Sequence, residues 1–244
     1  MMNGNAIDAH VAEIDRCNQR SARMLSVVDL LEAKTLTPEL AAYLLAAISR
    51  GASYLVGALP GSAGKTTVMG ALLNFVPATI ALKPADSAKT IADALAHLSP
   101  RRCWICHEIG AGGYYAYLWG PALRAYFELG RAGHQLATNL HADTYEQARA
   151  QVCDENGVPL EDFVRMNLAL FLRVRGGDRV VHEVWESDGA SVHRRIFAGG
   201  RLAGGRLADP ERVAQAGKTL DALMATGGRT IGDVRQFLVK SSAV

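Results

Sequence analysis

The sequence predicts an α/β fold with a mainly parallel sheet and helices on both of its faces. Short apolar runs alternate along residues 51–178 with stretches of helical periodicity, a pattern typical of parallel sheets. A loop rich in glycine joins the first apolar run to a helix. Further on, two strand-like runs flank Asp188-Gly189, and helical patterns follow them. We therefore expect a helical lead-in over 1–50, a core over 51–178, and a C-terminal β-hairpin with helices over 179–244.

The lead-in is predicted to be helical. Thr37-Pro38-Glu39 offers a hydroxyl for the N-cap, a proline for the first helical position and an acid for the first turn. The helix that starts there has apolar residues at helical spacing as far as Ser49. Gly51 follows and ends it.

The core is predicted from five short apolar runs with helical stretches between them. Apolar runs without alternation suit parallel strands that are buried on both faces. The expected strands cover residues 53–57, 79–82, 103–107, 135–139 and 168–174. The expected helices cover residues 66–75, 87–98, 114–131 and 144–153.

The C-terminal part is predicted to contain one hairpin and two helices. The hairpin strands are expected over 179–186 and 191–197, because Asp-Gly between them supplies the positive φ of a tight turn. A glycine-rich loop is expected over 198–205. Asp209-Pro210-Glu211 opens a helix that runs to residue 225, and Thr230 opens a last helix that runs to residue 240.

Composition and charge argue against several classes of protein. The formal net charge is +2 and the basic residues are scattered, whereas dedicated nucleic-acid binders concentrate them in a stripe. Residues 1–14 are polar and lack the apolar region of a signal peptide. No window approaches the roughly 18 continuous apolar residues of a membrane span. We expect a cytoplasmic protein with no transmembrane segment and no dedicated nucleic-acid binding.

Two cysteines, Cys103 and Cys106, form a C-x-x-C pattern that also occurs in metal and redox sites. They lie in a predicted strand, where residues three apart point to opposite faces. No second cysteine pair or Cys/His cluster completes a zinc site. We interpret both as small buried core residues.

A phosphate loop is predicted over residues 59–67, between the first core strand and its helix. Backbone N–H groups there can surround a phosphate, and the helix N-terminus adds partial positive charge. Lys65 is predicted to reach the β- and γ-phosphates of ATP, and Thr66 to place its hydroxyl on Mg²⁺. Leu59 stands where the strict pattern has glycine. The predicted nucleotide-binding residues are Gly61, Ser62, Ala63, Gly64, Lys65, Thr66 and Thr67.

Hydrolysis also needs a group that orients or deprotonates the attacking water. Glu108 ends the apolar strand over 103–107, and ligands of doubly wound sheets bind beyond the carboxyl ends of the strands, so we predict that Glu108 is the base. By alternation, His107 is expected opposite to Glu108 as a structural residue. Asn139 and His141 end the next strand and are expected in the same crevice. There His141 either contacts the γ-phosphate or bonds to a neighbouring loop.

Together these segments resemble the secretion ATPase superfamily of type II and type IV secretion, type IV pili and archaeal surface filaments. The resemblance extends over about residues 27–197. The segments that carry it are the lead-in over 27–39, the Walker A residues Lys65 and Thr66, the Walker B segment over 106–109, the Gly-His step over 132–134 and the His box over 138–142.

The resemblance implies a RecA-like P-loop core that binds ATP and Mg²⁺ and hydrolyses ATP. It implies catalytic roles for Lys65, Glu108 and His141 and makes Thr66 the metal ligand. It also implies a homo-oligomeric ring, usually a hexamer, that works with membrane platform proteins of a secretion or pilus machine. The expected function is a motor subunit that couples ATP hydrolysis to protein export or filament assembly. The expected location is cytoplasmic, either free or peripheral at the inner face of the membrane.

Three features differ from the family pattern. The residues before the core leave almost no room for the usual N-terminal domain, which supplies arginines to the nucleotide, so the resemblance is to a C-terminal ATPase core. Asp86 is the only acid within residues 81–86, near the place of the family's Asp box. Residues 109–111 hold no arginine, although one usually follows the Walker B glutamate. We consider Arg124 and Arg131 as its replacements.

Two other functions stay open at this point. A nucleotide-binding regulatory or scaffold protein would hold ATP with little or no hydrolysis. A P-loop kinase or another phosphotransferase would need a lid with clustered arginines, whereas the segment after Glu108 is aromatic, with Tyr114, Tyr115, Tyr117 and Trp119. Core or subunit packing explains these aromatic residues better than a substrate pocket does.

Overall fold

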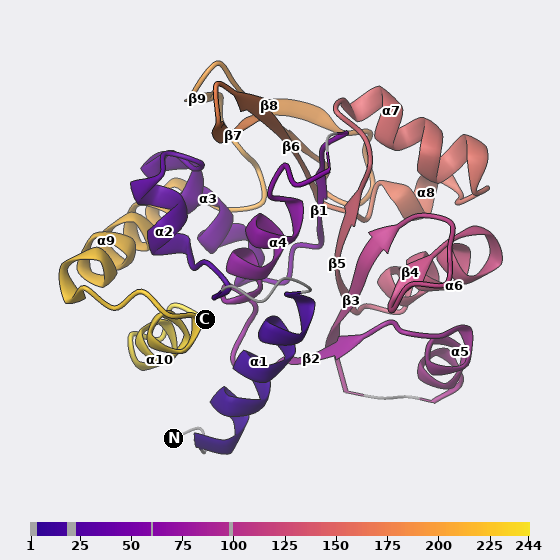
Figure 1. Ribbon diagram of the computed structural model, residues 1–244, viewed down its shortest axis with the longest axis horizontal. Coiled ribbons are helices and arrows are strands. Elements are labelled where there is room, and N and C mark those ends of the chain that lie inside the picture. The colour runs from indigo at the N-terminus through magenta and orange to yellow at the C-terminus, as the bar shows by residue number, and fades with distance from the viewer. Residues whose placement is uncertain (1–3, 19–22, 60, 98–99) are drawn as a thin grey trace.

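The computed structural model describes residues 4–18, 23–59, 61–97 and 100–244. In this part of the chain, nine strands form one sheet with the order β2-β3-β5-β1-β6-β7-β8-β9, and β4 pairs with β3 (Figure 1). Neighbouring strands from β2 to β6 run parallel, which confirms the predicted α/β fold. These strands are β2 (Ala81–Pro84), β3 (Arg102–Ile109), β5 (Gln135–Leu140), β1 (Tyr54–Gly57) and β6 (Leu168–Arg175).

An antiparallel extension continues the same sheet beyond β6. β7 (Asp178–Glu186) pairs with β6 and with β8 (Arg194–Ala198), which confirms the predicted hairpin, although a longer loop over 187–193 replaces the predicted tight turn. β9 (Arg201–Leu202) pairs with β8 inside the segment predicted as a loop. The tight turn between β6 and β7 was not predicted. It uses Gly176-Gly177 at φ 56° and 98°, a conformation that glycine adopts without steric cost. The sheet continues past residue 178. The predicted boundary between the core and the C-terminal extension at that residue therefore stays a prediction.

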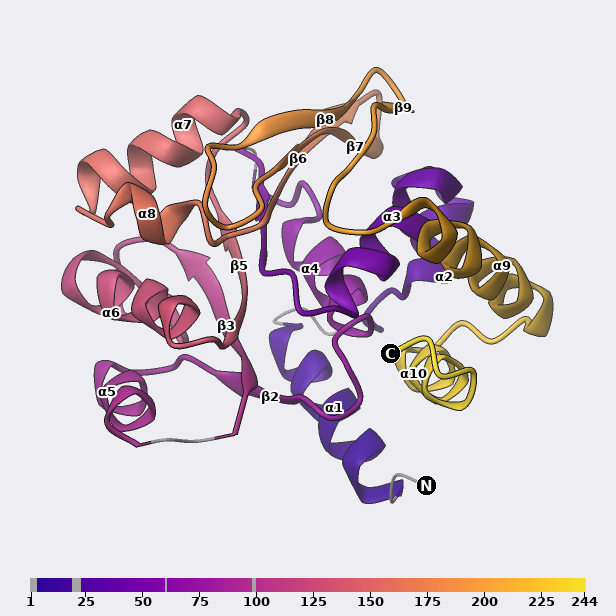
Figure 2. The same ribbon diagram turned by 180° about the vertical axis from the view of Figure 1, so that it is seen from behind.

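Helices from the two ends of the chain cover one face of the sheet, and helices from its middle cover the other (Figure 2). A hydrophobic core lies on each face of the sheet. Tyr54 and Val56 belong to the core on the face covered by the helices from the ends of the chain, and Leu55 belongs to the core on the other face, as alternation along β1 requires. No helix of the described residues is long and apolar enough to cross a membrane.

The first set of helices is α1 (Gly4–Cys17), α2 (Val27–Glu32), α3 (Pro38–Ile48), α4 (Lys65–Leu73), α9 (Pro210–Thr226) and α10 (Ile231–Lys240). The second is α5 (Ala88–Ala96), α6 (Gly120–Arg131), α7 (Tyr145–Arg149), η1 (Ala150–Glu155) and α8 (Leu160–Phe163).

The two cysteines of the C-x-x-C pattern are core residues, as predicted. Cys103 and Cys106 are fully buried and belong to the cores on opposite faces of the sheet. Burial raises the pKa of both thiols, that of Cys106 to about 12, so both stay protonated at neutral pH. The described residues contain no group of three or more His, Cys, Asp or Glu side chains that could hold a metal ion.

One predicted helix, over residues 114–131, starts later than expected. It begins at Gly120 as α6. The residues before it form β4 (Tyr117–Leu118), which pairs with the end of β3 at Glu108. The aromatic segment after Glu108 is therefore held to the edge of the sheet, where strand pairing overrides its helical spacing.

Other boundaries differ by smaller amounts. The second strand lies at 81–84 rather than 79–82, because Ile80 N–H closes a turn on the Pro77 carbonyl. The helix predicted over 144–153 is α7, which η1 continues as a π-helical turn. The predicted end of the helix over 87–98 falls on Leu98, which lies outside the described residues.

The C-terminal end of α4 is held by side chains from both ends of the chain. Arg235 of α10 is fully buried, and its Nη1 donates to the carbonyls of Asn74 at 3.0 Å and Val76 at 2.7 Å. His10 of α1 donates from Nε2 to the Leu73 carbonyl at 3.1 Å. Carbonyls at a helix C-terminus have no backbone partner within the helix, and positive charge is favourable there. The helix that follows the phosphate loop is thus fixed at its far end by α1 and α10.

Acid is expected to destabilise the protein through His10. Burial, helped by the charge of Arg235, lowers the pKa of His10 to about 3. Histidine in an unfolded chain has a pKa of about 6.5, so below that pH the unfolded state binds a proton that the folded state excludes. The free energy of unfolding should therefore fall by about 1.4 kcal/mol per pH unit between about pH 6.5 and pH 3 from this residue alone.

Denaturant titrations at several pH values measure this effect. Other buried histidines with lowered pKa values act in the same direction, so the comparison between variants is decisive. His10→Gln should make stability less dependent on pH, whereas the same change at the exposed His97 should not. Parallel pH profiles for the wild type and His10→Gln would contradict the assignment.

Candidate functional site

The phosphate loop lies between β1 and α4, as predicted. Its backbone turns through Ser62 at φ 67° and Gly64 at φ 93°, and α4 then begins at Lys65. The N-cap of α4 is Gly64, which supplies no side-chain capping bond, and N–H groups at an uncapped helix start can bind a ligand. Pro60 lies outside the described residues.

Two contacts explain the irregular start of this loop. A Cβ on Gly57 would lie 2.6 Å from the Ala142 carbonyl oxygen, so glycine is needed there for close packing against the chain after β5. Leu59 N–H donates to Asp143 Oδ1 at 2.6 Å, and the Leu59 side chain is half exposed. The position that departs from the strict glycine pattern is thus anchored through its backbone.

The three predicted catalytic residues meet at the N-terminus of α4. Lys65 Nζ lies 3.7 Å from Glu108 Oε1 and 3.2 Å from His141 Nδ1, and it donates to the Ala58 carbonyl at 3.2 Å. His141 Nε2 lies 3.8 Å from Glu108 Oε1. The group is assembled because β3 and β5 are neighbours in the sheet and both end at the phosphate loop.

Burial governs the charges of this group. Lys65 and Glu108 are 7% and 6% exposed. Burial lowers the pKa of Lys65 and raises the pKa of Glu108, and the attraction between them opposes both shifts. A carboxyl whose pKa is raised accepts a proton more readily than an ordinary glutamate, which suits a general base. Glu108 Oε1 is also buried and has no hydrogen bond among the described residues, and its nearest ionisable neighbours are Lys65 Nζ at 3.7 Å and His141 Nε2 at 3.8 Å.

His107 lies on the same side as Glu108, contrary to the expectation from alternation. The pairing of β3 with β5 slips between Cys106 and Ile109, so β3 has one residue more than β5 over this stretch. Such a bulge breaks the alternation of side chains. Both His107 and Glu108 therefore line the same cavity. Neither ring nitrogen of His107 has a hydrogen-bond partner among the described residues, so the expected structural bond is not formed.

Asn139 does not point into the cavity, which corrects a second expectation. Its side chain is fully buried, and Nδ2 donates to the His107 carbonyl at 2.9 Å. This hydrogen bond links the Asn139 side chain on β5 to the backbone of β3. His141, two residues further along, lies beyond the end of β5, and its half-exposed ring reaches the cavity. Its Nδ1 also lies 3.2 Å from the Leu59 carbonyl oxygen, so the structure shows the predicted alternative of a contact with a neighbouring loop.

A cavity of about 530 Å³ opens in front of these residues. The phosphate loop, the end of β3, the β6–β7 turn and the segment around α2 form its walls. All seven predicted nucleotide-binding residues, Lys65 among them, line the cavity, and so do Glu108 and His141. Thr66, directly after Lys65, carries a hydroxyl that can bind a metal ion. Mg²⁺ in phosphate sites is usually held by few protein ligands together with phosphate oxygens and water. The residues present therefore fit a magnesium–nucleotide complex.

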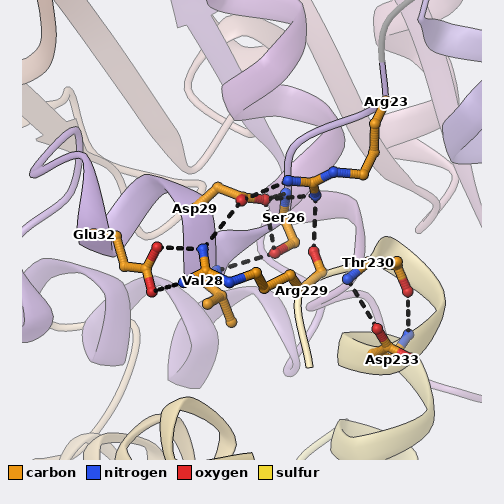
Figure 3. Close-up of polar contacts among 8 residues, drawn as sticks. All are labelled: Arg23, Ser26, Val28, Asp29, Glu32, Arg229, Thr230 and Asp233. Atoms are coloured by element: carbon orange, nitrogen blue, oxygen red, sulfur yellow. Dashed lines mark hydrogen bonds and ion pairs between the residues drawn. The ribbon is translucent and has the colours of Figure 1, made fainter. Parts of the chain in front are cut away.

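An ion-pair network supports the wall formed by α2 (Figure 3). Asp29, which lines the cavity, accepts from both terminal nitrogens of Arg23 at 2.8 and 2.7 Å and from Ser26 N–H at 2.7 Å. Arg23 also donates to the Arg229 carbonyl at 2.9 Å, and the Arg229 side chain pairs with Glu32. The wall of the cavity is thereby tied to the loop between α9 and α10.

The residues considered as substitutes for family features lie elsewhere. Asp86 Oδ1 accepts from the Thr90 hydroxyl at the start of α5, outside the cavity. Arg124 donates to the Asn156 carbonyl, and Arg131 forms an ion pair with the buried Asp162. Neither arginine lines the cavity.

Two residues near the site, Asp143 and Arg179, were not predicted, and His107 was predicted on the wrong side of β3. The bulge that turns His107 has no signature in an apolar strand. Asp143 follows His141 by two residues, so its position near the loop could have been inferred from the strand end. Arg179 lies near the site because the Gly176-Gly177 turn brings the start of β7 there. This pair of glycines was the sequence signal from which the turn could have been predicted.

Comparison with known proteins adds two structures. No protein-family model matches the sequence, and no curated protein matches it. The VirB11 ATPase of the Brucella suis type IV secretion system, solved with sulphate, is similar with a TM-score of 0.46 and 17% identity, over 66% of this chain and 55% of that one. The Legionella pneumophila ATPase DotB is similar with a TM-score of 0.38 and 10% identity, over 95% of this chain and 62% of that one. The chain thus spans less than two thirds of either protein.

Proposed function

We propose that the chain binds ATP with Mg²⁺ and hydrolyses it to ADP and phosphate. The observation that carries this proposal is the meeting of Lys65, Glu108 and His141 at one cavity, directly beside a phosphate loop. Three groups from β3, β5 and α4 converge there although the residues are far apart in sequence. Burial of Lys65 and Glu108 beside the cavity, with only the ion-pair contacts of Lys65 and His141 at Glu108 Oε1, supports a site that exchanges these contacts for a ligand.

Each residue has a distinct role in this proposal. The phosphate loop and the N-terminus of α4 bind the phosphates through backbone N–H groups. Lys65 leaves its contact with Glu108 and binds the β- and γ-phosphates, which frees the carboxylate for the attacking water. Glu108 accepts the proton of that water, and His141 donates to the γ-phosphate. Mg²⁺, bound through Thr66 and the phosphates, would supply stabilisation of the charge that develops on the leaving oxygen.

The motor role is part of the same proposal. The chain would act as the ATPase core of a homo-oligomeric ring, a hexamer by resemblance, that works with membrane platform proteins in protein export or filament assembly. It would be cytoplasmic or peripheral at the inner membrane face, with residues 1–50 as lead-in, 51–178 as core and 179–244 as extension. The resemblance of residues 27–197 supports these expectations.

A regulatory or scaffold role is the second candidate. Lys65 is paired here with Glu108 and His141, and a site that kept this pairing with nucleotide bound would hold ATP without cleaving it. Phosphate release and nucleotide binding, measured on the same wild-type preparation with Mg²⁺, separate the two roles. Release supports the ATPase, and binding without release supports the scaffold. A chain that binds no nucleotide would contradict both.

The hydroxyl of Thr66 is expected to make nucleotide binding depend on Mg²⁺. Thr66→Val should weaken the affinity for a non-hydrolysable ATP analogue with Mg²⁺ by about tenfold, or ~1.4 kcal/mol, because one metal ligand is lost. Without Mg²⁺ the affinity should be unchanged. Thr67→Val is the matched control, since its hydroxyl also lines the cavity but is not a predicted metal ligand. A Mg²⁺ dependence that is equal in the two variants would remove Thr66 from the metal site.

A further inference from the structure

Arg179 lies against the phosphate loop. It is the second residue of β7, directly after the Gly176-Gly177 turn. Its Nε donates to the Ser62 carbonyl at 3.0 Å, and its Cδ comes within 3.2 Å of the position that a Cβ on Gly64 would occupy. The loop and the β6–β7 turn are therefore in direct contact.

This contact leaves the charged end of the side chain available. The Nε bond fixes the plane of the guanidinium beside the loop, and neither terminal nitrogen has a partner among the described residues. An arginine presents its donors as a planar fork that suits phosphate oxygens. Arg179 is exposed and lines the cavity together with Lys65 and Glu108.

The charge of the cavity calls for a second cation. The charged residues that line it are the acids Asp29, Glu108 and Asp178 and the bases Lys65 and Arg179. Asp29 is neutralised by its ion pair with Arg23, so Glu108 and Asp178 are balanced by Lys65 and Arg179. A magnesium–triphosphate complex is itself negative, and without Arg179 the remaining wall would be negative as well. Arg179 is the only arginine among the described residues that line the cavity. Arg124 and Arg131 form their contacts elsewhere in the structure.

We propose that Arg179 binds the terminal phosphate of a bound nucleoside triphosphate, in the same chain as the phosphate loop. This inference rests on the proposed function and adds a phosphate-binding residue to it. The Ser62 contact anchors the guanidinium, and its two terminal nitrogens then reach the γ-phosphate across the loop from Lys65. The arginine that the sequence lacks after Glu108 is thereby replaced from the β6–β7 turn.

The proposal predicts a loss that depends on the number of phosphates. Arg179→Ala should weaken binding of a non-hydrolysable ATP analogue with Mg²⁺ by about 10-fold to 100-fold, because charge-assisted hydrogen bonds to the γ-phosphate are lost. Binding of ADP with Mg²⁺ should change by less than about threefold, since ADP lacks that phosphate. Arg179→Lys should restore part of the loss, and added guanidinium ion should restore part of it in Arg179→Ala.

Titration calorimetry on the full chain provides the test. Arg175→Ala is the matched control, because Arg175 is an exposed arginine of the same turn but does not line the cavity. Thermal unfolding of Arg179→Ala should match the wild type, which separates loss of a ligand contact from loss of fold. Equal losses for the ATP analogue and ADP, or no loss for either, would overturn the role of Arg179 while leaving the proposed function standing. A wild type that binds neither nucleotide would overturn both.

Discussion

Replacing Glu108 by glutamine is expected to lower the rate of phosphate release by about 100-fold to 10,000-fold, the usual contribution of a positioned general base. Glutamine keeps the shape of the side chain but cannot accept a proton from water. Binding of ATP should be retained or strengthened, because Lys65 loses its competing carboxylate partner at 3.7 Å. The expected result is therefore a variant that holds ATP and does not cleave it.

Single-turnover phosphate release together with nucleotide binding checks this prediction. Glu128→Gln on α6 is a matched control, since Glu128 is exposed and lies outside the cavity. The rate of the wild type should fall as the pH drops through the raised pKa of Glu108, because only the ionised carboxylate accepts the proton. Unchanged release by Glu108→Gln would exclude the carboxylate from the mechanism.

The largest effect on stability is expected from Gly57→Ala. The new methyl group would lie 2.6 Å from the Ala142 carbonyl oxygen and 2.8 Å from two ring atoms of Phe171. Both neighbours are fully buried, so neither can move away freely. Overpacking of this kind typically costs about 1–3 kcal/mol, and contact with a fixed backbone carbonyl places this variant at ~3 kcal/mol or above.

Denaturant unfolding measures the loss, and the same loop offers its control. Gly61→Ala adds the same methyl group at a position where nothing lies within 4 Å. Its free energy of unfolding should stay within about 0.5 kcal/mol of the wild type, as for most surface substitutions. If the two variants were equally stable, close packing would not be the reason for glycine at position 57.

Much of the site could be predicted because parallel strands deliver their ends to one edge of a sheet. Glu108 and His141 follow apolar runs, and the phosphate loop follows another, so their meeting needed only the strand assignments. The exact neighbours of each strand were not needed for that inference. The α/β class followed in the same way from alternating apolar and helical stretches.

The residues that were misplaced or not predicted depend on geometry that the strand assignments alone do not give. His107 faces the cavity because β3 has one extra residue relative to β5, and alternation alone cannot show a bulge. Asn139 was assigned to the crevice by its place at a strand end, yet a bond to the His107 carbonyl holds it within the sheet. Arg179 reaches the phosphate loop from 117 positions away in sequence, through a turn that only tertiary structure can place.

The hold of Arg235 on the end of α4 has a consequence for synthesis of the protein. Arg235 follows Val76, whose carbonyl it binds, by 159 positions. Translation proceeds from the N-terminus, so β1, the phosphate loop, Glu108 and His141 all leave the ribosome long before the residue that secures α4. Contacts that close such long loops form late in folding. A nascent chain therefore carries the residues of the proposed site before Arg235, and we expect the end of α4 to be fixed only once α10 has been made.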